Sequence, residues 1–322
     1  MKNFEFHDDQ DFPRFAMGAA ALSCVAVALT TFSAGADEPP EETVRSAVEA
    51  AERAAATESA LAAAGGESDT DDADISAAAA PAEPVSLATV PDDWVAAGLD
   101  LSKKKRVGDK YVQTLPNGAK VTLTLDPKVQ THLDKMLANY GVPHGGIVLL
   151  EPDTGRVLAM SSHTSHEPDV QDLARRSRAP SASVFKIVTA AALLESGAVG
   201  PDDNVCYHGG RSRLSARNIK GDPGRDHKCA NLGDALAWSI NSIMAKLAYK
   251  HLGADDMKVW AERFGYNTEI PFELPVEMSK AETVGDPLER ARMAAGFWHT
   301  FLSPLHGAMI AAAVQNDGVM MR

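Results

Sequence analysis

Apolar positions along this chain gather into a few well-separated runs. Residues 15–32 form one continuous apolar run, of about the length needed to cross a bilayer. Residues 120–126 alternate between polar and apolar side chains and predict a strand. Residues 187–196 form a second apolar run. It predicts a buried helix because it is rich in Ala and Leu, follows Pro180 and is closed by Gly197.

The positions between and after these runs predict the remaining elements. A helix is expected from Asp126-Pro127 to about Asn139, with proline in its first turn. Residues 146–150 and 156–160 are apolar segments joined by a turn, and they predict a hairpin. Further helices are predicted over 232–240, 242–252, 257–264 and 304–314, and irregular structure over 266–290.

Ser183 and Lys186 lie at the head of the predicted buried helix. Residues three apart share a helix face, so an amine would lie beside a hydroxyl. A serine hydroxyl is a weak nucleophile until a base takes its proton, and a lysine can be that base if apolar surroundings lower its pKa. Ser-x-x-Lys is a common pattern, however. It also occurs at residues 102–105, where a charged run favours a solvated loop.

Charge is distributed unevenly along the 322 residues, whose net charge is -13. Residues 37–93 hold roughly fifteen acidic and two basic side chains, which account for about the whole imbalance. The rest is near neutral, so nothing favours nucleic-acid binding. Because residues 37–93 are rich in Ala, Glu, Asp, Pro and Gly and lack aromatic residues, we expect an acidic, disordered tether.

The N-terminal segment, residues 1–36, has two interpretations. The apolar run is either a single-span membrane anchor or a cleaved signal peptide, since Ala34-Gly35-Ala36 resembles a signal-peptidase site. The residues before the run are acidic, which is unusual for both. In either case the bulk of the chain is exported. The expected location is therefore the inner (cytoplasmic) membrane with a periplasmic domain, or the periplasm if the signal is cleaved.

Cys206 and Cys229 occur in a loop rich in Gly and Arg. Outside the cytoplasm they could form a disulfide contributing about 3 kcal/mol by loop entropy. Two free thiols or a metal site are the alternatives. The spacing lacks the Cys-x-x-Cys pattern that zinc sites usually show, so metal is disfavoured and no cofactor is expected.

Four blocks of residues, in this order and spacing, resemble one known family. They are Leu125-Asp126-Pro127 with Gln130, the hairpin at 146–160, Ser183-Val184-Phe185-Lys186, and Ser239-Ile240-Asn241 with 245–248. Together they are similar to the transpeptidase domain of penicillin-binding proteins, serine acyltransferases related to the serine β-lactamases. Residues 94–322 would form this domain, with helices flanking an antiparallel sheet in an α+β fold.

The resemblance also implies roles for the matching residues. Ser183 would attack the carbonyl of the D-Ala-D-Ala end of a peptidoglycan stem peptide, and Lys186 would accept its proton. Ser239 would relay protons to the leaving amine. Asn241 would bind the substrate amide and the lysine side chain. The implied partners are stem peptides, β-lactam antibiotics and cell-wall synthesis proteins.

The chain departs from the family at its third motif. No Lys-Thr-Gly or Lys-Ser-Gly occurs in the sequence, and the chain ends where the family continues into the strand that carries it. That strand supplies the second oxyanion donor, and loss of one donor costs on the order of a hundredfold in rate. We therefore expect a fold incomplete at its C-terminus, in which the hairpin at 146–160 has an exposed edge. The chain is either truncated or a degenerate copy.

Three functions follow from these observations. The first is a membrane-tethered D,D-transpeptidase that cross-links stem peptides and binds β-lactams. The second is an inactive module that binds cell-wall peptide or a partner protein, which the missing motif favours and the presence of Ser183, Lys186, Ser239 and Asn241 disfavours. The third is a β-lactamase or β-lactam sensor. It would need a residue that activates the deacylating water, and no clear Glu-containing loop serves this role, although Glu273, Glu277, Glu282 and Glu289 lie in the irregular region.

Overall fold

The structure is a computed structural model that describes residues 26–32, 93–140, 142–165, 172–211 and 213–321. It divides into two compact units, one of residues 1–37 and 124–322 and one of residues 38–123. Most of the predicted N-terminal segment and nearly all of the predicted tether lie outside the described residues. The boundaries at 36 and 93 therefore remain predictions.

The described part of the smaller unit is a three-stranded antiparallel sheet. Its strands are β2 (Lys105–Val107), β3 (Lys110–Thr114) and β4 (Lys120–Leu123), in the order β2-β3-β4. The buried side chain of Gln113 accepts a hydrogen bond from the Asp100 amide and donates one to the Gly98 carbonyl, which attaches the preceding loop to the sheet. The predicted strand at 120–126 is real but ends at Leu123.

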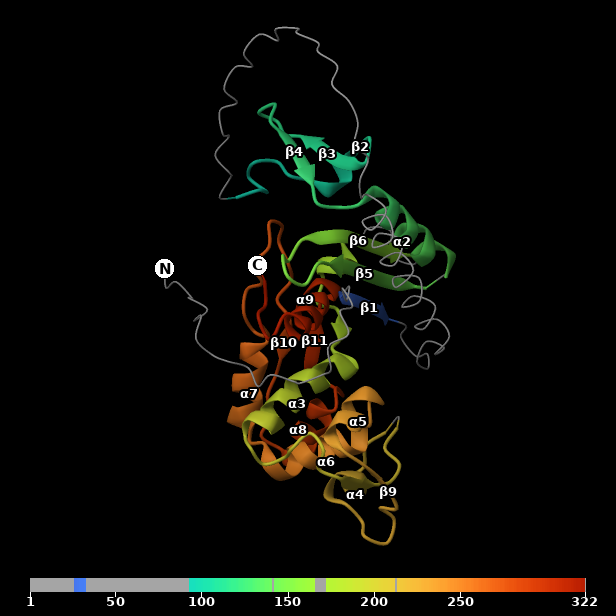
Figure 1. The fold of residues 1–322 in the computed structure, drawn as a ribbon, viewed down its shortest axis with the longest axis vertical. Coiled ribbons are helices and arrows are strands. Elements are labelled where there is room, and N and C mark those ends of the chain that lie inside the picture. The colour runs from blue at the N-terminus through green and yellow to red at the C-terminus, as the bar shows by residue number, and fades with distance from the viewer. Residues whose placement is uncertain (1–25, 33–92, 141, 166–171, 212, 322) are drawn as a thin grey trace, which may run out of the picture. The chain divides into compact units, whose positions relative to one another are not determined.

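The larger unit contains a sheet of order β1-β5-β6. It consists of β1 (Ala26–Phe32), β5 (His144–Leu150) and β6 (Val157–Thr164), all antiparallel, so the predicted hairpin is confirmed. Residues on both faces of β5 are buried, because α2 (Pro127–Asn139) packs against β6 and α9 (Pro304–Gln315) packs against β1 and β5 (Figure 1). Helix α2 begins where predicted. The Asp126 carboxylate caps its first amides, and Pro127 occupies its first position.

The edge of β5 that the sequence left without a partner is covered in the structure, while β6 is the other outer strand of this sheet. β1 pairs along it from Ala26 opposite Leu150 to Phe32 opposite His144, and so satisfies the backbone groups of this edge. The residues of β1 are the last part of the apolar run predicted as an anchor or signal, and residues 15–25 lie outside the described part. Among the described residues, none of the helices combines the length and the apolar character that a membrane crossing requires.

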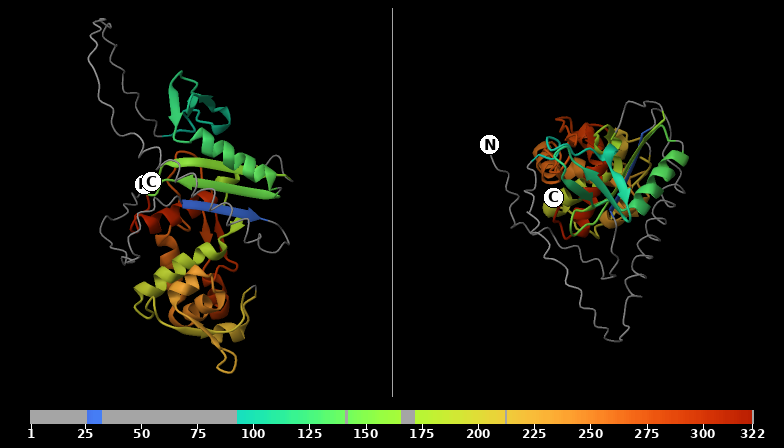
Figure 2. Two further views of the ribbon diagram at one scale, coloured as in Figure 1. Left: turned by 45° about the vertical axis from the view of Figure 1, so that its right-hand side comes forward. Right: turned by 90° about the horizontal axis from the view of Figure 1, so that it is seen from above.

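A helical region lies at the other end of this unit (Figure 2). At its centre is α3 (Phe185–Glu195), with Phe185, Val188 and Leu193 fully buried. The surrounding elements are α4 (Ala216–Lys220), α5 (Leu232–Ala237), α6 (Asn241–His251), α7 (Ala254–Arg263), α8 (Pro287–Ala294) and the hairpin of β8 (Val205–Tyr207) and β9 (Lys228–Ala230).

Helix α8 was not predicted. It begins inside the stretch assigned as irregular and extends beyond it to Ala294. Its Asp286 cap and Pro287 are the usual signals of a helix start. It is only eight residues long and carries little apolar pattern, so periodicity alone does not reveal it. A small sheet connects the helical region with the segment before α3. Its order is β10-β11-β7, formed by β10 (Lys280–Ala281), β11 (Thr300–Leu302) and β7 (Ala179–Pro180).

Candidate active site

Ser183 lies in a short 3-10 helix (Ala182–Val184) that leads directly into α3. Lys186 is the second residue of α3, so its side chain points back over the turn that carries Ser183. Its side chain is fully buried. An amine so completely removed from water needs hydrogen-bond partners, and two serine hydroxyls supply them.

The three polar side chains form a closed triangle. The Nζ atom of Lys186 donates to Oγ of Ser183 at 2.7 Å and to Oγ of Ser239 at 2.8 Å. The Ser239 hydroxyl donates to Oγ of Ser183 at 2.7 Å. Each pair is within proton-transfer distance, so the arrangement can move a proton from one serine to the lysine and on to the other serine.

The turn that carries Ser183 is held from outside the helix. The Ser181 amide donates to the Thr300 carbonyl at 3.0 Å, and the Tyr266 hydroxyl donates to Oγ of Ser181 at 3.0 Å. Burial raises the pKa of Tyr266 far above its usual range, although the Ser181 contact opposes this, so the phenol keeps its donor proton. These bonds fix the residues just before the serine.

Ser239 reaches the triangle because the chain turns sharply between two helices. α5 ends at Ala237 and α6 begins at Asn241, while Ser239 takes a left-handed backbone conformation with φ of 54°. Non-glycine residues rarely adopt this conformation, which occurs often at functional sites. The amide of Ile240 donates to the Ala235 carbonyl at 2.8 Å and thereby closes the turn.

Asn241 lies two residues after Ser239, at the start of α6. Its Nδ2 donates to the carbonyl of Arg211 at 2.5 Å. No pattern in the sequence signals this contact, because Arg211 is distant in the chain. The binding of substrate and of Lys186 by Asn241 remains a prediction.

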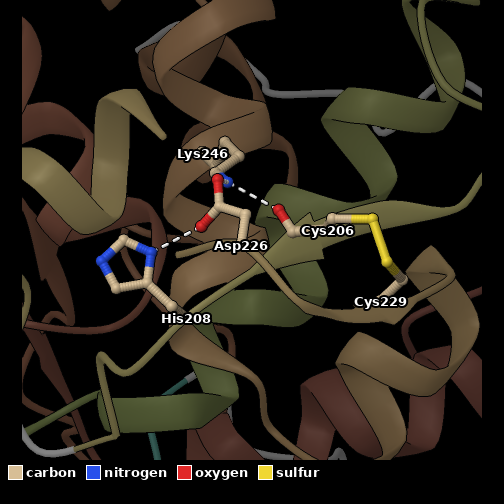
Figure 3. The surroundings of a disulfide bond; sticks show 5 residues. All are labelled: Cys206, His208, Asp226, Cys229 and Lys246. Carbon is tan, nitrogen blue, oxygen red and sulfur yellow. Dashed lines mark hydrogen bonds and ion pairs between the residues drawn. A yellow bond between two sulfur atoms is a disulfide. The ribbon is translucent and has the colours of Figure 1, made fainter. Parts of the chain in front are cut away.

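Cys206 and Cys229 are joined by a disulfide in the structure, directly opposite each other in the pair β8 and β9 (Figure 3). Within the described ranges, no group of three His, Cys, Asp or Glu side chains is arranged to hold a metal ion.

Sequence reasoning missed a buried histidine behind the site. His306 of α9 is completely buried, donates from Nε2 to the Phe264 carbonyl at 2.7 Å and lies against the ring of Tyr266. Burial lowers the pKa of His306 to about 4, although the bond to the carbonyl opposes the shift. It therefore packs as a neutral ring behind Tyr266, which in turn contacts Phe185 at the start of α3.

The fold and this site define a class of protein. The family described as the penicillin binding protein transpeptidase domain matches residues 145–322, more than half of the chain, so the chain belongs to this family. The α+β fold inferred from the sequence agrees with the match.

Individual relatives support this assignment. The peptidoglycan D,D-transpeptidase PbpA of Mycolicibacterium smegmatis is 29% identical over 250 residues, which cover 68% of this chain and 50% of that protein. PbpA of Mycobacterium tuberculosis is 30% identical over the same shares. The chain thus spans about half the length of these relatives. The D,D-transpeptidase domain of a peptidoglycan glycosyltransferase from Eggerthella lenta has a TM-score of 0.50 at 25% identity, covering 66% of this chain and 68% of that one.

Proposed function

We propose that this chain carries the serine acyltransferase chemistry of a peptidoglycan D,D-transpeptidase, with Ser183 as nucleophile. The observation that carries the proposal is the triangle of Ser183, Lys186 and Ser239, built from two segments that are far apart in the sequence. A nucleophilic serine needs a base within hydrogen-bond distance and a second group to pass the proton on, and both are present.

The proposed reaction transfers an acyl group through Ser183. Oγ of Ser183 attacks the substrate carbonyl carbon while its proton passes to Nζ of Lys186. The tetrahedral intermediate then expels the amine of D-alanine, which receives a proton through the hydroxyl of Ser239. An ester between Ser183 and the acyl group remains. The amine of a neighbouring stem peptide resolves that ester, and Ser183 recovers its proton, which leaves a cross-link.

The proposal includes substrates and location. Stem peptides are the proposed acyl donors, since PbpA of both mycobacterial species is a peptidoglycan D,D-transpeptidase by name. β-Lactams are proposed to acylate the same serine, since the family is named for binding penicillin. Such substrates lie outside the cytoplasm, where a disulfide such as Cys206–Cys229 also persists. Attachment to a membrane through the N-terminal segment, and binding to other cell-wall synthesis proteins, are further parts of the proposal.

A second candidate is a module that binds cell-wall peptide without chemistry. The intact mass of the full chain after incubation with benzylpenicillin distinguishes the two. We expect one covalent adduct on the wild type and none on Ser183→Ala.

Other outcomes are equally informative. No adduct on a folded wild-type protein would favour the binding module, and an adduct on both proteins would exclude Ser183 as the nucleophile. Loss of the adduct within minutes would indicate a β-lactamase, because transpeptidases and β-lactam sensors retain the acyl group for longer.

A further inference from the structure

The segment of residues 206–211 runs along the first turns of α6 and is bonded to them. Asn241 donates from Nδ2 to the Arg211 carbonyl at 2.5 Å. The next residue, Ser242, donates from Oγ to the Gly209 carbonyl at 2.6 Å. The backbone of this segment therefore determines where the side chain of Asn241 lies.

This contact is close because of a glycine. Gly210 has φ of 79°, and a Cβ atom at this position would come within 2.0 Å of Oγ of Ser242. No larger residue would allow the segment to lie so near α6. Asn218 of α4 adds a further bond, from Nδ2 to the carbonyl of His208 at 2.9 Å.

An ion-paired cluster fastens the same segment to α6 at a second place (Figure 3). The Asp226 carboxylate accepts from Nδ1 of His208 at 2.5 Å and from Nζ of Lys246 at 2.8 Å. Lys246 lies on α6 and also donates to the Cys206 carbonyl at 2.6 Å. The three charged or polar side chains are only 11–18% exposed, so water competes weakly for these bonds.

The carboxylate of Asp226 is ionised in this setting. Burial opposes ionisation, but the hydrogen bonds from His208 and Lys246 outweigh it and hold the pKa of Asp226 well below its usual range. The disulfide between Cys206 and Cys229 closes the loop that contains both Asp226 and the bonded segment. Asp226 is thus ionised at neutral pH, and both it and His208 lie within this closed loop.

We propose that Asp226 is a positioning residue for Asn241. The contacts form a closed path that leaves α6 at Lys246, passes through Asp226 and His208, and returns to α6 at the bond between Arg211 and Asn241. Removing the carboxylate breaks the bonds that join Lys246 of α6 to His208. The Arg211 carbonyl then loses its fixed position, and the side chain of Asn241 moves with it. The consequence for acylation rests on the proposed function.

The test compares Asp226→Asn with Asp222→Asn in the full chain. Both remove one negative charge from the same loop, but the Asp222 side chain is not part of the path. It makes ion pairs of 3.7 Å and accepts a hydrogen bond from the Gly224 amide at 3.1 Å, which asparagine can still accept. Hydrogen exchange is measured by mass spectrometry on peptides that cover residues 239–243. We expect about tenfold faster exchange there in Asp226→Asn, with α3 unchanged, and wild-type exchange in Asp222→Asn.

The rate of acylation by a fluorescent penicillin is the second measurement. Asp226→Asn should acylate about tenfold more slowly per folded molecule, because Asn241 is less well placed. Lys246→Met should show the same faster exchange and slower acylation. Lys246→Arg keeps a positive charge beside Asp226, so both measurements should be close to the wild-type values. If Asp226→Asn does not fold, the two Lys246 variants still test the proposal.

The two proposals fail in different ways. A wild-type protein without acylation would refute the proposed function, and the exchange data would still test the positioning of Asn241. Wild-type exchange at 239–243 in folded Asp226→Asn and Lys246→Met would overturn the positioning role. So would an exchange increase spread evenly over the whole larger unit, since it would indicate general destabilisation.

Discussion

Gly296 lies directly against the backbone of Ala182, so that a Cβ atom at position 296 would come within 2.0 Å of the Ala182 carbonyl oxygen. Ala182 itself has a left-handed conformation with φ of 46° and immediately precedes Ser183. The loop that follows α8 therefore supports the turn of the proposed nucleophile from outside, through a contact that only glycine permits.

Gly296→Ala should displace the turn that carries Ser183. The added methyl group cannot be accommodated by rotation of a flexible side chain, since it meets backbone atoms, and such overpacking costs about 1–3 kcal/mol. The matched control is Gly197→Ala. Gly197 also has a positive φ, but a Cβ there would meet nothing within 4 Å. The control should lose only about 1 kcal/mol of stability, because alanine is strained in the left-handed conformation.

Chemical denaturation and penicillin acylation check this prediction together. We expect Gly296→Ala to be the less stable protein and to acylate slowly even under conditions where it is folded. Gly197→Ala should acylate at the wild-type rate. Equal stability and equal acylation in the two variants would show that the contact with Ala182 does not hold the serine.

Lys186→Met should abolish acylation of Ser183 while leaving the protein folded. Methionine has a similar length and suits a fully buried position, but it cannot accept the serine proton. Loss of a general base typically lowers a rate by about 10²–10⁴-fold. Ser239→Ala keeps the base and removes the proton relay, so its loss should be smaller. Stopped-flow acylation measures both. Lys186→Met acylating at the wild-type rate would contradict the assignment of the base.

His306 should make the protein less stable in acid. Burial lowers its native pKa to about 4, below the value of about 6.5 expected when the chain is unfolded. The unfolded chain therefore binds the proton more readily between these values. The contribution of His306 to the free energy of unfolding is fully present above pH 6.5. It decreases by roughly 3 kcal/mol as the pH falls toward 4.

The variant His306→Gln isolates this contribution, because glutamine can still donate to the Phe264 carbonyl but does not titrate. The difference in unfolding free energy between wild type and variant should change with pH between 6.5 and 4 and be constant above 6.5. Parallel stability curves across the whole range would show that His306 does not titrate in this window.

Local sequence signals predicted several elements well. Asp126 and Pro127 begin α2 because a capping carboxylate and a proline act within one turn, without help from the rest of the fold. The apolar run after Ser183 predicted α3 for a similar reason, since a helix that is apolar on all sides must be buried. Ser183 and Lys186 lie together because they are three residues apart along one helical path.

Other features depend on contacts between distant segments, which periodicity does not encode. Gly296 resembles any loop glycine until Ala182 is placed against it. Helix α8 is too short and too polar to be recognised by its pattern. The edge of β5 looked exposed because its partner, β1, precedes it by more than a hundred residues and carries the apolar character of a membrane segment.

The start of α2, the buried helix α3 and the pairing of Ser183 with Lys186 can be predicted from the sequence alone, because each depends on residues within a few turns of one another. The order of the motifs is also read directly from the sequence. The contacts by which Ser239 completes the triangle and Asn241 bonds to Arg211 become visible only in the folded chain. Both contacts join segments separated by tens of residues, and their geometry is determined by the packing of α3 and α6 and by the disulfide-closed loop between them.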